Sequence, residues 1–147
     1  MDPQALIPDL SSPEVQAFAS GFPTTLAHAG VTALMLLVGA TLYALLTPYK
    51  EISLIREGNG AAAVAFGGVL VGLALPLAAS LSSSNSILEI VVWGVATLLV
   101  QLLAFRIIDI VLTGLPSRIQ EGEVSAAVLL VSAKLACAVI LSAAVAG

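Results

Sequence analysis

The sequence predicts an all-α membrane protein with four transmembrane helices, and its composition and long apolar runs carry that prediction. Hydrophobic residues make up 59% of the 147 residues, charged residues make up 10%, and the mean hydropathy is +1.10. A soluble domain needs far more polar side chains than this to cover its surface, so the bilayer must cover the chain. The apolar runs exceed the roughly 9–11 residues of a transmembrane β-strand, which leaves the α-helix as the spanning element.

Four apolar segments are long enough to cross a hydrocarbon core of about 30 Å, which takes about 20 helical residues. These segments cover residues 26–46, 60–80, 87–112 and 124–146. The predicted organisation is a tail, a first transmembrane hairpin and a second transmembrane hairpin, over residues 1–25, 26–81 and 87–146.

The tail before the first span is acidic and rich in proline, unlike the basic start of a signal peptide. Ser12, Pro13 and Glu14 predict a helix start, with an N-cap, a first-turn proline and a favourable charge at the helix dipole. Two interpretations stay open for the segment 13–20: a short helix on the membrane surface, or a disordered tail.

The basic residues of the loops predict the orientation in the membrane. Lys50 and Arg56 lie in the loop after the first span, and Arg118 lies in the loop after the third. The tail, the 82–86 loop and the C-terminus hold no Lys or Arg. The positive-inside rule therefore places both basic loops on the cytoplasmic side of the membrane and both termini on the outside.

An internal repeat is suggested by sliding the chain on itself by 64 residues. This offset aligns Glu57-Gly58 with Glu121-Gly122 and gives eight identities over the 24 positions from Glu57 to Ser80. Several of these identities are expected from the abundance of Ala, Val and Leu alone. We expect two parallel-repeat hairpins, each with a basic corner, related by an axis along the membrane normal.

A series of short motifs extends from Thr47 toward the C-terminus. The motifs are Thr47-Pro48, Glu51, Leu54-Ile55, Asn59, Ala61-Ala62, Ala65-Phe66, Gly68, Gly72, Pro76-Leu77, Ser86, Trp93-Gly94, Gln101-Leu102-Leu103 and Phe105. This series resembles the YjfL-like family of bacterial inner-membrane proteins, a family of unknown function. The resemblance implies four spans and, because some members are encoded near membrane-stress proteins of the phage-shock type, a role in envelope homeostasis. The chain departs from the family pattern at Asp109, where a basic residue is expected, and at Lys134, where a small apolar residue is expected.

Charge and residue counts exclude several classes of function. Five basic residues against nine acidic ones leave no basic patch for binding nucleic acid. One cysteine and one histidine are too few for a metal site of the Cys/His kind. No nucleophile elbow, zinc-protease, phosphate-loop or dinucleotide motif is present, so we expect no enzyme and no cofactor.

Of the residues in the predicted spans, Lys134 has the highest free-energy cost of insertion into the bilayer. It lies ten residues, or about 15 Å, into the last span. At the same depth, the third span offers Gln101 and no carboxylate within about two turns. Lys134 either faces a polar pore or subunit interface and binds an anion or proton, or it snorkels or pairs with a carboxylate of a neighbouring subunit.

The other charges of the spans have simpler explanations. Arg106 and Asp109 are three residues apart, which predicts a local ion pair, with a gating or ion-path role as the alternative. Glu89 lies near the outward end of the third span, where it acts as an anchor if hydrated.

The second span is suited to close helix contact. Gly68 and Gly72 form a Gly-x-x-x-Gly motif, which lets a partner backbone approach and predicts a subunit contact. Pro76 removes the hydrogen bond to the Gly72 carbonyl, which predicts a packing kink or a cation ligand.

These observations favour a non-enzymatic membrane protein that forms a homo-oligomer, with the bilayer, copies of itself and membrane-stress proteins as partners. The alternative is a channel or transporter for ions or small solutes, with its path between subunits.

Overall fold

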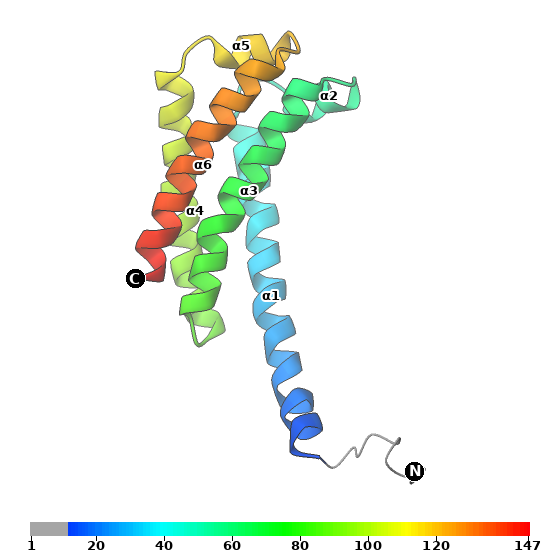
Figure 1. Cartoon of the computed structure of the whole chain (residues 1–147), viewed down its shortest axis with the longest axis vertical. Helices are drawn as coiled ribbons and strands as arrows, with labels where there is room; N and C mark the ends of the chain where they lie inside the picture. Colours follow the sequence, from blue (N-terminus) through cyan, green and yellow to red (C-terminus); the bar gives the residue numbers. More distant parts are fainter. Residues whose placement is uncertain (1–11) are drawn as a thin grey trace, which may run out of the picture.

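The computed structural model describes residues 12–147, and within this range its regular secondary structure is all α-helix, with no strand. Four long helices and two short ones follow one another along the chain (Figure 1). They are α1 (Pro13–Leu46), α2 (Glu51–Arg56), α3 (Gly60–Ser83), α4 (Ile87–Val111), α5 (Leu115–Gln120) and α6 (Val124–Ala146). The four long helices are each apolar and long enough to cross a membrane, so the predicted all-α fold with four spans is confirmed.

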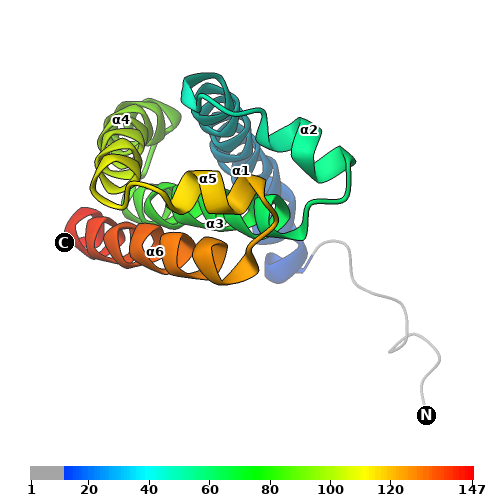
Figure 2. The ribbon, with the colours of Figure 1, turned by 90° about the horizontal axis from the view of Figure 1, so that it is seen from above.

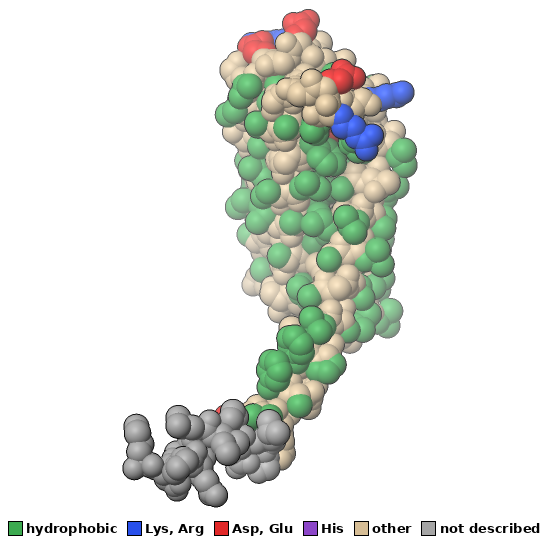
Figure 3. All heavy atoms as spheres, turned by 90° about the vertical axis from the view of Figure 1, so that its right-hand side faces the viewer, with side chains coloured by type: hydrophobic (Ala, Val, Ile, Leu, Met, Phe, Trp, Pro, Cys, Tyr) green, Lys and Arg blue, Asp and Glu red, His purple; other side chains and the backbone are tan. Residues whose placement is uncertain are grey.

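The long helices form a bundle with α3 near its centre, packed most extensively on α6 (Figure 2). The short helices α2 and α5 lie across one end of this bundle, and the C-terminus lies at the opposite end (Figure 1). Most charged side chains on the face shown in Figure 3 gather at the end that carries α2 and α5. The chain therefore has one charged end, which we call the basic end because it carries the loops with Lys50, Arg56 and Arg118.

Helix α1 differs from the other spans in length. It begins at the predicted N-cap, where the Ser12 hydroxyl accepts from the Val15 backbone N–H and Pro13 occupies the first turn. It then runs for 34 residues through Pro23, so 13–25 form one helix with the span. Residues 1–11 of the predicted tail lie outside the described range. At 1.5 Å per residue α1 extends about 51 Å, well beyond a hydrocarbon core of about 30 Å.

The corners after α2 and α5 have the same backbone conformation at an offset of 64 residues. Gly58 and Gly122 have φ angles of +91° and +89°, a left-handed conformation that glycine adopts without a steric penalty. Each glycine N–H donates to the carbonyl three residues earlier, at Ile55 and Ile119, with N···O distances of 3.0 Å. These two corners lie at the basic end and begin α3 and α6 with the same geometry.

Asn59 ties the two corners together. Its Oδ1 caps α3 by accepting from the Ala62 N–H at 2.9 Å. Its Nδ2 donates to the carbonyls of Ile119 at 3.0 Å and Gln120 at 3.1 Å, in the other corner. One side chain thus satisfies a helix N-terminus and the carbonyls of a second helix end.

The small-residue face of α3 packs inside the chain. A Cβ atom added to Gly68 would lie 2.5 Å from Val131 of α6, and one added to Gly72 would lie 2.6 Å from the Phe105 ring of α4. Pro76, on the same face, is fully buried. The expectation that Gly68 and Gly72 form a subunit contact is wrong, because α4 and α6 of the same chain already occupy this face.

Candidate intramembrane polar site

Four polar side chains meet inside the bundle near the basic end. The Lys134 Nζ of α6 lies 2.8 Å from Asp109 Oδ1 of α4 and donates to the Tyr43 hydroxyl of α1 at 2.9 Å. The Tyr43 hydroxyl in turn donates to Glu51 Oε1 of α2 at 3.3 Å. Lys134 is only 1% exposed, and Glu51 is 2% exposed. This intramembrane polar site therefore joins α6 to α1 and α4 through the ammonium group, and α1 to α2 through the Tyr43 hydroxyl group.

The geometry of helices explains why Lys134 reaches Asp109 and not Gln101. Side chains tilt toward the N-terminus of their own helix, and the N-terminus of α6 lies at the basic end. Lys134 therefore extends its long side chain toward the basic end, while Asp109 on the antiparallel α4 tilts toward the membrane centre. Gln101, the residue at the same backbone depth, is therefore not its partner. The alternative in which Lys134 pairs with a carboxylate of a neighbouring subunit is wrong, because the carboxylate comes from the same chain. The sequence analysis compared the backbone depths of residues in the membrane and did not include the length and direction of the lysine side chain.

Aromatic rings enclose the ammonium group. Lys134 Nζ lies 4.8 Å from the ring centroid of Tyr43 and 5.3 Å from that of Phe105, within the range of cation–π attraction. The two rings meet edge to face, with centroids 6.1 Å apart and an interplanar angle of 89°. The rings replace part of the water that a charged lysine loses on burial.

Glu51 is the member of the site that lies outside the spanning helices. Burial raises the pKa of its carboxyl group, against the opposite effects of the Lys134 ammonium and of the Tyr49 and Tyr43 hydroxyl groups. The charge of Glu51 is therefore less stable than that of an exposed glutamate. The sequence analysis used Glu51 only as part of the family resemblance. An acidic residue in a basic corner, eight residues after a tyrosine at the end of a span, was the signal for this pair.

Two cavities lead to Asp109 from the basic end. The larger has a volume of about 250 Å³ and is lined by Thr47, Pro48, Tyr49, Arg106, Asp109, Ile110, Thr113 and Pro116. The smaller has about 20 Å³, room for about one water molecule, and also borders Tyr43, Arg106 and Asp109. The ion pair is thus approached from one end of the molecule.

Arg106 and Asp109 do not form the predicted local ion pair. Within residues 12–147 the ion pairs are Lys134 with Asp109 and Arg118 with Glu123. Arg106 is exposed, whereas Asp109 turns inward to the buried ammonium group. A partner inside the bundle attracts the carboxylate more strongly than an arginine that water or lipid headgroups solvate, because the interior has a lower dielectric constant.

Gln101 and Glu89 lie apart from the site. Gln101 is fully buried, and neither atom of its amide group has a hydrogen-bond partner among the described residues. Glu89 is exposed and accepts from the Asn85 N–H at 2.7 Å, while its own N–H donates to the Ser86 hydroxyl. This arrangement resembles a capping box and explains Glu89 as part of the start of α4.

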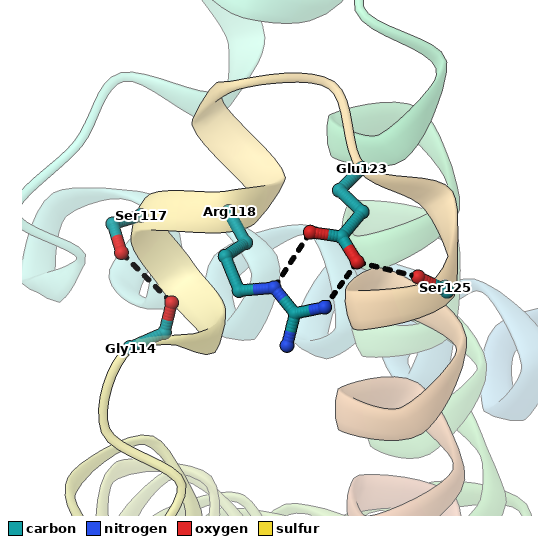
Figure 4. Close-up of polar contacts among 5 residues, drawn as sticks. All are labelled: Gly114, Ser117, Arg118, Glu123 and Ser125. Carbon is teal, nitrogen blue, oxygen red and sulfur yellow. Dashed lines mark hydrogen bonds and ion pairs between the residues drawn. The ribbon is translucent and has the colours of Figure 1, made fainter.

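A second ion pair closes the corner between α5 and α6 (Figure 4). Arg118 Nε donates to Glu123 Oε2 at 2.6 Å, a second bond joins the same two side chains, and Ser125 donates to Glu123 at 2.7 Å. The hydrogen bonds from Arg118 and Ser125 lower the pKa of the Glu123 carboxyl group. Both charged side chains are exposed to solvent, so this pair fixes the corner and is not a binding site.

Among residues 12–147, no three His, Cys, Asp or Glu side chains are placed to hold a metal ion. The fold and the site together define an integral membrane protein with four spans and a buried, ion-paired polar site near one end.

Comparison with known proteins gives the family. A family model described as a domain of unknown function, DUF350, matches residues 17–145, and the chain belongs to this family. It is similar to the "UPF0719 inner membrane protein YjfL" of Escherichia coli strain K12, with 31% identity over 102 residues, 69% of this chain and 77% of the relative. It is also similar to the "UPF0719 transmembrane protein YshE" of Bacillus subtilis strain 168, with 35% identity over 83 residues, 56% of this chain and 62% of the relative. No solved structure matches the chain.

The family confirms the resemblance identified from the motifs. Asp109 and Lys134, the two charges that the sequence analysis expected to depart from the family pattern, form the buried ion pair. Each charge is therefore balanced by the other.

Proposed function

We propose that this protein is a non-enzymatic scaffold of the bacterial inner membrane, which assembles with copies of itself and acts in envelope homeostasis. The observation that supports it best is the closure of the polar site. Lys134 finds a carboxylate, a hydroxyl group and two aromatic rings within its own chain. The group best suited to bind a solute in the spans is thus engaged in holding four helices together.

Self-association is supported by the length of α1. Its buried residues all lie between Met35 and Tyr43, and its N-terminal half extends past the other helices (Figure 1). Phe18 and Phe22 in this half are 63% and 44% exposed. A span longer than the bilayer core must tilt or find partners, and such mismatch favours helix association. We infer that the N-terminal halves of α1 from several copies pack together.

The repeat and the orientation are part of the same proposal. The matching corners at Gly58 and Gly122 support two parallel hairpins that share one design. The common location of α2 and α5 at one end supports a single cytoplasmic face, with both termini outside (Figure 1).

A channel or transporter is the second candidate. The cavity of about 250 Å³ beside Arg106 and Asp109 supports it, because it opens a polar approach to the buried ion pair. Such a path would run between subunits and would use the charges of the site.

The test combines the mass of the purified particle with ion flux in liposomes. The scaffold proposal expects an oligomer and no flux above that of protein-free liposomes. It also expects Phe18→Ser with Phe22→Ser to lower the mass, whereas Leu99→Ser, on the lipid-facing side of α4, leaves it unchanged. A monomeric wild type overturns the assembly, and flux that Lys134→Leu alters favours the channel.

Orientation is tested by single cysteines in a Cys137→Ala background, since Cys137 is the one cysteine of the chain. Cysteines introduced by Ser84→Cys and Ser117→Cys should react oppositely with an impermeant reagent added to cells. Labelling of Ser117→Cys from outside overturns the cytoplasmic assignment of the basic end.

A further inference from the structure

The first hairpin contains a large cavity on the far side of Glu51 from the ion pair of the polar site. It lies between α1, α2 and α3, has a volume of about 570 Å³, and we call it the α1–α3 groove. Leu37, Thr41 and Leu45 line it along α1, and Leu70 lines it from α3. The Thr41 hydroxyl donates to the Leu37 carbonyl of its own helix, so the surface of the groove is apolar here.

The groove is elongated along the membrane normal. Leu37 and Leu45 are eight residues apart, so the lining extends about 12 Å along the axis of α1. Its length matches a segment of extended hydrocarbon chain. The groove also opens on the outer surface of the bundle, where acyl chains of the bilayer surround the protein.

One end of the groove is polar and carries a positive charge. Lys50 and Ser53 line it there, at the basic end, where the lipid headgroups begin. Glu51 also borders the groove, but its Oε1 accepts from Tyr43. Lys50 forms no ion pair within residues 12–147. On the side of the molecule shown in Figure 3, Lys and Arg side chains project just above the apolar surface of the spans.

We propose that the α1–α3 groove binds one anionic phospholipid of the bilayer, with an acyl chain along Leu37, Thr41 and Leu45 and the phosphate at Lys50 and Ser53. Two features support a lipid over a second copy of the chain. The apolar part runs parallel to the acyl chains, and the positive charge lies at the depth of a headgroup. Basic pockets between spanning helices at the cytoplasmic side recognise anionic headgroups in this way.

The second hairpin shows why the groove is open. At an offset of 64 residues, Thr41 corresponds to Phe105, whose ring fills the interior beside Lys134. A small side chain at position 41 therefore leaves space that a large one fills in the other hairpin. Thr41→Phe should close the groove without adding or removing a charge.

The test uses tryptophan fluorescence and brominated lipids, which quench only in contact. Trp93 is the one tryptophan of the chain, so Trp93→Phe gives a silent background. Ile52→Trp places a reporter at the rim of the groove, and Leu103→Trp places one on the lipid-facing side of α4. Each protein is reconstituted in phosphatidylcholine vesicles that contain a minor fraction of brominated phosphatidylglycerol or brominated phosphatidylcholine.

At the Ile52→Trp reporter, brominated phosphatidylglycerol should be preferred about fivefold over brominated phosphatidylcholine. This is the factor that one lysine contributes to binding near an anionic headgroup. The Leu103→Trp reporter should show no preference. Lys50→Gln should remove the preference, whereas the control Arg56→Gln, on the same helix but outside the groove, should retain most of it. Thr41→Phe should reduce quenching by both lipids, and the control Leu99→Phe should not.

Equal quenching by the two lipids at the rim overturns the proposal. So does a preference that survives both Lys50→Gln and Thr41→Phe. A disulfide between cysteines introduced by Thr41→Cys in two copies of the chain, in a Cys137→Ala background, would show that a second copy fills the groove and would also overturn it.

Discussion

The two transmembrane hairpins have matching corners but opposite interiors. At an offset of 64 residues, four residues that line the α1–α3 groove correspond to four residues of the second hairpin, two of which form the buried ion pair. The pairs are Leu37 and Gln101, Thr41 and Phe105, Leu45 and Asp109, and Leu70 and Lys134. The second hairpin fills its interior with an ion pair and an aromatic ring, whereas the first leaves a cavity open to lipid. Under the proposed repeat, one backbone plan supports either interior, and a few side chains decide which.

The largest expected effect comes from removing one partner of the buried ion pair. Lys134→Leu leaves Asp109 as an uncompensated buried charge and should reduce the free energy of unfolding by about 3–5 kcal/mol. Leucine is also the residue at the corresponding position of the first hairpin, Leu70. Chemical unfolding in detergent, followed by circular dichroism, measures the change.

The double variant Lys134→Leu with Asp109→Leu is the matched control, since it gives the second hairpin the residues of the first. It should recover most of the lost stability or exceed that of the wild type, because both desolvated charges are gone. A double variant no more stable than Lys134→Leu would show that the pair itself, and not the isolated charge, determines stability.

The next effect tests the packing of α3 against the second hairpin. Gly72→Ala places a Cβ atom 2.6 Å from the Phe105 ring and should cost about 1–3 kcal/mol. Gly67→Ala on the same helix meets nothing within 4 Å and should be neutral or stabilising by up to about 1 kcal/mol. The same unfolding measurement compares them, and equal values for the two would contradict the close packing.

The corners provide a direct test of the shared plan. Gly58→Ala and Gly122→Ala both force a side chain into a left-handed conformation, so each should cost about 1–2 kcal/mol. The two costs should be similar if the corners are equivalent, because the two glycines have nearly the same φ angle. A cost at one corner only would break the structural equivalence.

Glu51 connects the polar site to the first hairpin, and its raised pKa makes stability depend on pH. The folded protein binds the proton of Glu51 more tightly than the unfolded chain does. Its contribution to stability is therefore complete below the ordinary glutamate pKa and is lost as pH rises through the raised value. Glu51→Gln should remove this decrease and become relatively more stabilising as pH rises. The pH dependence of chemical unfolding, compared between the wild type and Glu51→Gln, measures this change.

The smallest effect is expected at the exposed corner of the second hairpin. Arg118→Ala removes the ion pair with Glu123 and should lower stability less than any of the changes above, because both side chains are exposed to solvent. The loss should shrink at high salt, because solvent ions screen exposed charges. Thermal unfolding at low and high salt measures it, and a salt-independent loss would show that the corner depends on packing.

Local sequence and composition determined the insertion in a membrane, the four spans and several helix ends. A hydrophobic run must form a helix in lipid because no water satisfies its backbone there. Ser12, Asn59 and Ser86 act as N-caps through contacts with residues three positions away, so they depend on neighbours in the chain. The glycines after α2 and α5 were likewise recognisable as a repeated pair.

Only the tertiary structure decided which groups meet. Lys134 pairs with Asp109 and Tyr43, 25 and 91 residues away along the chain, because helix packing and side-chain direction bring them to one point. The same packing assigned the glycine face of α3 to α4 and α6, and not to a second copy. Sequence patterns specify each helix by itself, since they report local spacing. The partners of a buried charge depend on the directions of long side chains from several packed helices, which no local pattern contains.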